Sequence, residues 1–549
     1  MAFKKNILLV GSNDRASLAC ARSLANKYYV HIARFTVSKN VACYSNTVTD
    51  SHYVGNPEEC LSEVTGNIEA INLNTKFDFI LPITDEALIV VERLRERDFL
   101  NCKFLIPNTT QLDTAQDKFL IKEFCEDIEE LYYPETMLLT NDLFDANHKY
   151  EVTDFPVYLK TRKSSFVVDD YIVSYSVKKI NNTIELNNYL RDVLAHVDVL
   201  VQKTVEGKGV GLNVFSISGD VVAQSVNERV HEPRGGGGGV FRKTRKPSLT
   251  ESNIISKIVR KLNWTGPLMI ELKRNNRGWC LIELNCRFWG SLTGTIFSGH
   301  NYPLIHTCFF DDDKDNITAL PEAKTVTSRN LLKDIAWTLK NKKPLELFKI
   351  LLSPIDVFTG KDIYDVERLN DIKPAFFQFL VKFNQYAFIT KLKKVAFLAA
   401  YSSELFKIKS IKSDDISKRI SIICRGNVNR SAFAAHYFFK MANITIESQS
   451  TIRMEKRKVS LLAYETAIKL FDIDMDKHRS TSVFGKLNDY DIFLCMDFRN
   501  VFELLEMGVA KDKVRLFPSG EVKDPHGGED MEFEQCFKLI ASEINGLIK

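Results

Sequence analysis

The sequence predicts an α/β protein of several domains, and three observations support this fold class. A chain of 549 residues is too long for one ordinary hydrophobic core. Short apolar runs followed by amphipathic helical stretches occur near both ends of the chain, in NILLVGSNDRASLACARSLANK and ISIICRGNVNRSAFAAHYFFK. Hydrophobic residues make up 45% and charged residues 26%, which is the composition of a globular protein.

Composition and charge argue against several classes of protein. The net charge of +4 is small for this length and does not indicate nucleic-acid binding. No apolar run is long enough to span a bilayer, and MAFKKNILLV leads into an expected strand without a signal sequence. The 11 cysteines include no CxxC pair, so neither a disulfide framework nor a zinc site is predicted. We expect a cytoplasmic protein, whose oligomeric state the sequence does not indicate.

Residues 1–110 are predicted to form a Rossmann-like α/β domain. NILLV, FDFILPI and KFLIPN are apolar runs typical of buried strands, and helical stretches follow the first two. A GxGxxG motif is absent, so dinucleotide binding is not predicted.

Residues 111–310 are predicted to form an α+β domain. The expected strands are VYLKT, VLVQKTV, NVFSIS, VVAQSV, LMIELKR and CLIELN. The last two are separated by the polar turn NNRG, and a hairpin there would bring Glu271, Glu283 and Asn285 together. Three oxygen ligands suit Mg²⁺ that bridges nucleotide phosphates, and Arg287 could neutralise transferred charge. Glutamates on the solvent face of a hairpin are the alternative.

Residues 311–418 are predicted to form a helical region and a linker. LLKDIAWTLKNKKPLELFKILL and PAFFQFLVKFNQYAFITKLKKVAFLAAY are apolar and rich in lysine. This pattern permits peripheral membrane contact through residues 375–400 as well as ordinary helix packing. The polar stretch FKIKSIKSDDISK, residues 406–418, is typical of a linker, after which residues 419–549 begin a new domain.

The last domain opens with a strand, a turn and a helix, in ISIIC, RGNVN and RSAFAAHYFFK. Backbone N–H groups and the helix dipole favour a bound dianion at such a turn, and they also favour the thiolate of Cys424. Arg430, six residues on, can hold two oxygens of a phosphate. Ser431 can donate a hydrogen bond to the sulfur, and Asp524 in KDPHGG is a candidate general acid. A buried structural thiol is the alternative for Cys424.

Residues 419–549 resemble the low-molecular-weight protein tyrosine phosphatases, whose loop pattern is C-x-G-N-x-C-R-S and whose acid lies in an Asp-Pro loop. The resemblance includes HRSTSV and DYDIFLCMDFRN and implies an α/β domain with a central parallel sheet. It implies the following roles: Cys424 is the nucleophile, Arg430 binds phosphate, Asn427 shapes the loop, Ser431 assists the thiolate and Asp524 is the acid.

Three departures from this family bear on the substrate. The second loop cysteine is Asn429, the residue after Asp-Pro is His526, and Arg453 and Lys456 lie where a wall tryptophan is often found. Aromatic walls sandwich a phosphotyrosine ring, so both phosphotyrosine and a more polar or anionic phosphomonoester stay open as substrates. An arsenate reductase of the same fold would need resolving cysteines, and Cys495 in IFLCM has no close partner cysteine in the sequence.

Residues 1–310 resemble the ATP-grasp superfamily, with residues 1–110 as the pre-ATP-grasp domain and residues 111–310 as the ATP-grasp domain. The resemblance rests on IPNTTQLDTAQDKFLIKEFCEDI, PVYLKTRKSS, VQKTVEG and IELNCRFWGS, in this order. It implies ATP and Mg²⁺ as cofactors. The implied contacts are Lys118 and Lys160 at the nucleotide phosphates, Gln202, Lys203 and Val205 at the adenine, Glu206 at the ribose, Glu271, Glu283 and Asn285 at Mg²⁺, and Arg287 at the transferring phosphoryl group.

The run Gly235 to Gly239, flanked by Arg234 and Arg242, reads as a surface loop on composition alone. In relatives close to carbamoyl-phosphate-synthase-like ligases a glycine-rich loop folds over the triphosphate, and the resemblance implies that role here. By the same analogy TDEAL, residues 84–88, lies at the substrate cleft of the first domain.

Enzymes of this kind activate a carboxylate as an acyl phosphate, which an amine then attacks. The prediction is therefore a bifunctional enzyme, in which a ligase for small-molecule carboxylate and amine substrates is joined to a phosphatase with a phosphocysteine intermediate. The alternative is a regulatory protein tyrosine phosphatase with a nucleotide-binding scaffold that lacks ligase turnover.

Overall fold

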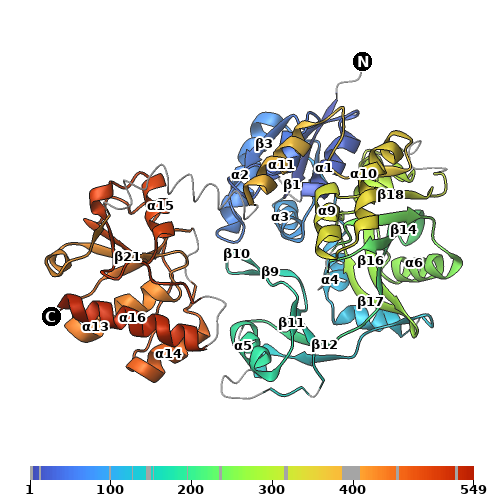
Figure 1. Ribbon diagram of the computed structural model, residues 1–549. Helices are drawn as coiled ribbons and strands as arrows, with labels where there is room; N and C mark the ends of the chain where they lie inside the picture. The colour runs from blue at the N-terminus through green and yellow to red at the C-terminus, as the bar shows by residue number, and fades with distance from the viewer. Residues whose placement is uncertain are drawn as a thin grey trace. The chain divides into compact units, whose positions relative to one another are not determined.

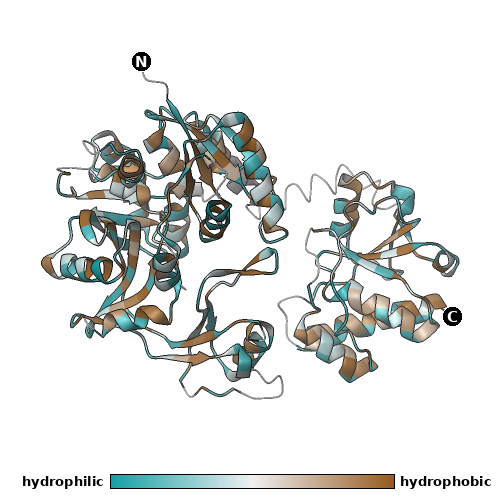
Figure 2. Ribbon diagram, turned by 180° about the vertical axis from the view of Figure 1, so that it is seen from behind, coloured by the Kyte–Doolittle hydropathy of each residue, from teal (hydrophilic) through white to brown (hydrophobic). Residues whose placement is uncertain are grey.

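The computed structural model describes most of the chain, as residues 4–11, 14–97, 101–126, 128–143, 150–152, 154–194, 196–233, 238–313, 320–385, 408–452, 457–525 and 530–548. These residues form two compact units, Met1–Asn384 and Gln385–Lys549, each with its own sheets and core (Figure 1). Hydrophobic stretches follow the strands of each unit, while hydrophobic and hydrophilic residues alternate along many helices (Figure 2). The predicted mixed α/β architecture is confirmed.

The first unit begins with a parallel sheet whose strand order reverses at its first strand, as in doubly wound folds. The run from residue 7 to residue 10 is buried on both faces: Leu8 and Val10 join one hydrophobic cluster, and Ile7 and Leu9 join another. This confirms the Rossmann-like prediction. In sheet order the strands are β3 (Asp50–Tyr53), β2 (Tyr28–Arg34), β1 (Lys5–Val10), β4 (Phe79–Pro82) and β5 (Lys103–Phe104), and the helices are α1 (Asp14–Leu24), α2 (Leu61–Thr75) and α3 (Asp85–Glu96).

A smaller antiparallel sheet and a hairpin follow. The expected strand VYLKT is β8, which pairs with two neighbours in this sheet. In sheet order the strands are β11 (Lys178–Ile180), β8 (Val157–Thr161), β12 (Val199–Lys203) and β7 (Thr136–Leu139); the hairpin is β9 (Ser165–Val168) and β10 (Tyr171–Ser174), and the helices are α4 (Thr109–Gln116) and α5 (Thr183–Val193).

An eight-stranded sheet forms the rest of the first unit. It contains the four expected strands NVFSIS, VVAQSV, LMIELKR and CLIELN as neighbours or near neighbours. In sheet order the strands are β19 (Asp362–Tyr364), β18 (Val326–Arg329), β15 (Phe241–Arg245), β14 (Asp220–His231), β13 (Lys208–Ile217), β16 (Gly266–Asn275), β17 (Gly278–Asn285) and β6 (Leu131–Tyr132), and the helices are α6 (Leu249–Lys261), α7 (Leu292–Phe297), α8 (Tyr302–Phe310), α9 (Leu331–Lys340), α10 (Pro344–Phe358) and α11 (Lys373–Gln385).

Residues 311–418 differ from the predicted helical region and linker. Helices α9, α10 and α11 lie there as expected, but β18 and β19 also do, and they extend the eight-stranded sheet. Part of the proposed membrane contact, residues 386–400, lies outside the described residues. Among the helices that are described, none is both long and apolar enough to cross a membrane.

The edge of this sheet is fixed by a buried ion pair. In β15, which begins shortly after the glycine run, Arg242 is 2% exposed and donates two hydrogen bonds of 2.6 and 2.7 Å to Asp365. Removing one partner of a buried pair leaves an uncompensated charge, which costs about 3–5 kcal/mol.

We therefore expect Asp365→Ala to destabilise the first unit by about that amount. All four tryptophans of the chain, Trp264, Trp279, Trp289 and Trp337, lie in this unit, so their fluorescence during urea unfolding reports on it alone. Glu322→Ala is the matched control, because Glu322 is 79% exposed and its pair with Lys246 should contribute little. A similar small effect of both variants would contradict the prediction.

The second unit has a five-stranded parallel sheet, which confirms the predicted architecture of the last domain. Part of the expected linker, residues 406–418, joins this sheet as its edge strand, because Ile411 is buried in the core. In sheet order the strands are β20 (Lys409–Ser410), β24 (Val514–Leu516), β23 (Ile492–Cys495), β21 (Ile420–Cys424) and β22 (Glu447–Ser450), and the helices are α13 (Arg430–Ala442), α14 (Leu461–Phe471), α15 (Phe498–Glu506) and α16 (Asp530–Ile548).

Candidate active sites

The first candidate site is the loop between β21 and α13. Cys424 ends the strand, and Arg430 begins the helix, so the loop lies at the helix N-terminus. Asn427 adopts the left-handed conformation, with φ of 51°, which turns the loop around the sulfur. Its backbone N–H lies 3.2 Å from Sγ of Cys424, and the hydroxyl of Ser431 lies 3.0 Å from the same atom. Two donors therefore converge on the predicted nucleophile.

The side chain of Asn427 ties this loop to its surroundings. Its amide nitrogen donates to Ser431 at 3.0 Å and to Ser448 in β22 at 2.8 Å, and its oxygen accepts a 2.9 Å hydrogen bond from the N–H of Thr481. Because Ser431 in turn donates to the sulfur, Asn427 orients both the loop and the hydroxyl. Asn427, the residue predicted to shape the loop, thus contacts three segments around it.

Arg430 is buried and held by acceptors that surround it. One nitrogen of its guanidinium donates to Asp497 at 2.7 Å and to the carbonyl of Val522 at 2.8 Å, and the other donates to Asp524 at 2.8 Å. Burial lowers the pKa of Arg430, but Cys424, Asp524 and Asp497 outweigh this effect and raise it. The sequence prediction missed Asp497, whose position directly after the apolar strand IFLCM was the available signal.

These residues meet at a cavity of about 140 Å³. The sequence prediction did not name Arg425, Gly426, Val428, Ile452 or Arg457 as site residues, and no described lining residue is aromatic. The predicted polar replacements Arg453, Lys456 and His526 lie outside the described residues. The described lining consists of Cys424, Arg425, Gly426, Val428, Asn429, Arg430, Ile452, Arg457 and Asp524.

Asn429 stands where the related phosphatases have a second cysteine, and it has a structural contact of its own. Its oxygen accepts a 2.5 Å hydrogen bond from the hydroxyl of Ser460, which also caps α14 by accepting from the N–H of Ala463. The replacement therefore links the loop to the neighbouring helix.

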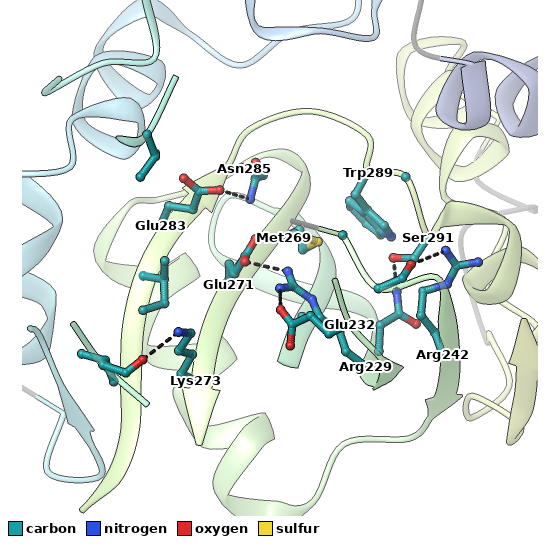
Figure 3. A pocket seen from close by; sticks show the side chains of 18 of the residues that line it. Arg229, Glu232, Arg242, Met269, Glu271, Lys273, Glu283, Asn285, Trp289 and Ser291 are labelled. Atoms are coloured by element: carbon teal, nitrogen blue, oxygen red, sulfur yellow. Dashed lines mark hydrogen bonds and ion pairs between the residues drawn. The ribbon is translucent and has the colours of Figure 1, made fainter. Parts of the chain in front are cut away.

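The second candidate site is a cavity of about 580 Å³ in the first unit, over β16 and β17 (Figure 3). Glu271 and Glu283 lie directly opposite each other on these strands, and the register shifts next to Glu271 so that Ile282 and Glu283 both line the cavity. The side-chain amide nitrogen of Asn285 lies 3.4 Å from a carboxylate oxygen of Glu283. The predicted hairpin thus brings the three proposed metal ligands to one cavity.

Two carboxylates opposite each other repel unless a cation lies near them. Burial raises the pKa of Glu271, and the charge of Glu283 adds to this effect, while Arg229 opposes it. Among the described residues, no group of three or more histidine, cysteine, aspartate or glutamate side chains could hold a metal ion. A metal site here would therefore use two glutamates and the amide oxygen of Asn285.

Arg229 is a residue of this cavity that the sequence prediction missed. It donates 2.6 Å hydrogen bonds to Glu271 and to Glu232 (Figure 3). Gly209 lies on β13, the strand between Arg229 on β14 and Glu271 on β16. Because it has no side chain, Arg229 can pass over it to reach Glu271; a Cβ at residue 209 would lie 2.8 Å from the Arg229 side chain. The alternating glycines Gly209 and Gly211 of β13 were the sequence signal for a close approach.

The two predicted phosphate-binding lysines are buried near Glu283. Burial lowers the pKa of Lys118 and of Lys160, and in both cases Glu283 acts in the opposite direction. Lys160 lines the large cavity, whereas Lys118 lines a second one of about 60 Å³ and donates to Ser164 at 2.8 Å. The two cavities share Glu283, Asn285 and Arg287, so both lysines face the proposed metal ligands.

Three of the four residues predicted at the nucleoside, Gln202, Lys203 and Val205, line the large cavity. Glu206 is not among its described lining residues. Protein groups already contact this segment, since Lys273 donates to the carbonyl of Val205 at 2.7 Å.

The remaining predicted residues that the structure describes lie in or next to this cavity. Arg287 forms a 3.0 Å ion pair with Asp85 at the start of α3, within the predicted TDEAL segment. Gly238 and Gly239 line the cavity, while Arg234 and residues 235–237 lie outside the described residues. Arg242 also lines it, with its guanidinium paired to Asp365.

The charge of the large cavity suits an anion with several negative groups. Basic side chains outnumber acidic ones among its described lining residues. The basic residues are Arg15, Lys160, Lys179, Lys203, Arg229, Arg242, Lys273 and Arg287, and the acidic residues are Glu232, Glu271 and Glu283.

Comparison with known proteins gives results for both units. Among solved structures, L-amino acid ligase from Bacillus licheniformis is 14% identical, with a TM-score of 0.42 over 58% of this chain and 76% of that one. N5-carboxyaminoimidazole synthetase from Staphylococcus aureus is 15% identical, with a TM-score of 0.42 over 63% of this chain and 89% of that one. Low molecular weight protein tyrosine phosphatase from T. tengcongensis is 26% identical, with a TM-score of 0.23 over 24% of this chain and 98% of that one.

No curated protein matches the chain. Residues 419–549 match the family model described as low molecular weight phosphotyrosine protein phosphatase. At its C-terminal end the chain therefore carries a module of this phosphatase family, at the residues where the sequence predicted one.

Proposed function

We propose that the chain is a bifunctional enzyme, with a phosphatase in its second unit and an ATP- and Mg²⁺-dependent ligase in its first. The observation that carries the phosphatase is the convergence of Cys424, Arg430 and Asp524 on one cavity, with two donors aimed at the sulfur. The substrate is a phosphomonoester, and phosphotyrosine is the family's example.

The first chemical step transfers the phosphoryl group to the protein. Sγ of Cys424 attacks phosphorus and the bond to the leaving oxygen breaks, while Asp524 donates a proton to that oxygen. Arg430, fixed by Asp497 and the carbonyl of Val522, binds the equatorial oxygens together with loop N–H groups.

The second step hydrolyses the phosphocysteine. Asp524, now a carboxylate, takes a proton from water as the water oxygen attacks phosphorus, and the S–P bond breaks. The hydrogen bond from Ser431 stabilises the departing thiolate of Cys424, so the same hydroxyl that orients the nucleophile assists its release.

We expect Asp524→Asn to lower kcat/KM for phenyl phosphate by about 10²-fold or more, because asparagine cannot protonate the leaving oxygen in the first step. The loss should shrink for 4-nitrophenyl phosphate, whose leaving group needs less protonation. Stopped assays of phenol and nitrophenol release measure both rates. Asp489→Asn serves as the control, since Asp489 is an exposed residue of the same unit that does not line the cavity. Equal losses for the two substrates would argue against Asp524 as the acid.

The ligase proposal rests on the opposed glutamates Glu271 and Glu283 within a cavity of basic side chains. Glu271, Glu283 and Asn285 would hold Mg²⁺, since two carboxylates and an amide oxygen are ligands that this ion prefers. Bound MgATP would supply an activated γ-phosphoryl group for a carboxylate substrate, whose acyl phosphate an amine then attacks.

The other predicted residues position the nucleotide and the phosphoryl acceptor. Lys118 and Lys160, both buried, stabilise phosphate charge, and Arg287 offsets charge on the transferring group. Gln202, Lys203 and Val205 contact the adenine, and Glu206 contacts the ribose.

Release of ADP tests the ligase. A screen of small carboxylates and amines should reveal a pair that stimulates ADP release only when both are present. A regulatory phosphatase with a nucleotide-binding scaffold would instead bind MgATP without such stimulation. The cluster of Lys160, Glu271, Glu283 and Asn285 in one cavity favours the ligase.

A further inference from the structure

Two arginines that the phosphatase chemistry does not use line the cavity at Cys424. Arg425 directly follows the nucleophile, and Arg457 precedes α14. Both side chains are exposed, so they lie at the rim of the cavity rather than beneath it. They come from two separate segments of the chain, and folding brings both to the same cavity.

The phosphoryl group has binding groups of its own in this cavity. Arg430 and the N-terminus of α13 lie where a dianion would bind. Arg430 is also paired with Asp497 and with Asp524, the one carboxylate among the described lining residues. Arg425 and Arg457 are further positive charges at the same cavity, to which the proposed phosphoryl transfer assigns no role.

Apolar side chains are few in the described lining. They are Val428 and Ile452, and no described lining residue offers an aromatic ring on which a phenyl group could stack. Among the described lining residues, Arg425 and Arg457 are the charged groups that could bind the rest of the substrate.

The backbone at Arg457 is fixed, although its side chain is exposed. Its N–H donates to the hydroxyl of Ser480 at 3.0 Å, and its carbonyl accepts from the N–H of Ser480 at 2.8 Å. The chain thus presents Arg457 to the cavity from an anchored position.

We propose that the phosphatase site selects phosphomonoesters that carry a second anionic group, which Arg425 and Arg457 bind at the rim. This inference rests on the proposed phosphatase function. The second anion is a carboxylate or phosphate near the scissile phosphoryl group, either within a small molecule or on an acidic residue beside a phosphorylated side chain.

A matched pair of substrates tests the proposal on the full chain. Wild type should have a kcat/KM for 4-carboxyphenyl phosphate about tenfold above that for phenyl phosphate, because each exposed ion pair contributes a few-fold. Arg425→Met and Arg457→Met should each lower this ratio about threefold, chiefly through KM for the carboxylated substrate. The double variant should lose the preference, and added salt should weaken it in wild type.

Arg419→Met is the control, since Arg419 is an exposed arginine of the same unit that does not line the cavity. It should keep the wild-type ratio. If wild type prefers neither 4-carboxyphenyl phosphate over phenyl phosphate nor an acidic phosphotyrosine peptide over a neutral one, the inference is wrong and the phosphatase stands. If wild type hydrolyses neither substrate nor 4-nitrophenyl phosphate, the proposed phosphatase function itself fails.

Two phosphotyrosine peptides, one flanked by aspartates and one by asparagines, distinguish the sources of the second anion. An arginine-dependent preference for the acidic peptide alone would assign the site to phosphoproteins. A preference for 4-carboxyphenyl phosphate alone would assign it to small molecules. Preferences that persist in the Arg425 and Arg457 double variant would overturn the proposal.

Discussion

Cys424→Ser is expected to reduce hydrolysis of phenyl phosphate by about 10⁴-fold or more, because the variant loses the nucleophile of a covalent mechanism. A serine hydroxyl at this position is a far weaker nucleophile than a thiolate. The loop that binds phosphate should be preserved, since Asn427 keeps its contacts with Ser431 and with Ser448 in β22, and Arg430 keeps its contact with Asp497. Phenol release measures the loss. Inorganic phosphate should still protect the variant from unfolding, which would show that the site is intact.

Cys536→Ser is the matched control in the same unit. Cys536 lies in α16, and burial raises its pKa to about 12, so it remains a thiol at neutral pH and cannot serve as a nucleophile. We expect this variant to keep turnover within a few-fold of wild type. Turnover that persists in Cys424→Ser, or that disappears equally in Cys536→Ser, would sink the assignment of Cys424.

Much of what the sequence predicted in both sites depends on residues close together in the chain, whereas the distant Asp524, Lys118 and Lys160 were predicted from their own motifs. Cys424, Asn427, Arg430 and Ser431 lie within one strand, turn and helix, whose apolar pattern was clear. Glu271 and Glu283 come from one hairpin with a short polar turn, so their opposition follows from local pairing.

The parts that were missed depend on contacts between distant segments. The stretch Phe241–Arg245 has alternating burial, but its buried residues are Arg242 and Thr244, which no hydrophobic pattern marks as a strand. Their burial becomes understandable only with Asp365, more than a hundred residues later, and with Asn227 on β14. Strands β18 and β19 were missed as well, because they too are short and partly polar.

The rim residues illustrate the same limit at the phosphatase site. Asp497 could have been noticed as a polar residue after a buried strand, but nothing local connects Arg457 with Cys424. Asn429 looked like the loss of a cysteine, and only the fold shows that it binds Ser460.

Glu283→Gln is expected to lower ligase turnover, measured as ADP release with an active substrate pair, by about 10³-fold. Glutamine keeps the size of the side chain and one oxygen ligand but removes a charge from the proposed Mg²⁺ site. Stabilisation by a metal ion is worth several kcal/mol, and about 4 kcal/mol corresponds to this factor. Glu322→Gln, at a residue that is 79% exposed and remote from the cavity lining, should leave turnover unchanged.

The response of the same variant to nucleotide separates the proposed function from the fold. Glu283 lies directly opposite the like charge of Glu271, but it also faces the buried Lys118 and Lys160. Removing its charge therefore relieves one repulsion and leaves two buried lysines less compensated, so the stability without nucleotide is only the reference for the test. MgATP should raise the Tm of wild type and do so far less for Glu283→Gln. An equal rise of Tm in both proteins would argue against Glu283 as a ligand of the proposed Mg²⁺ site.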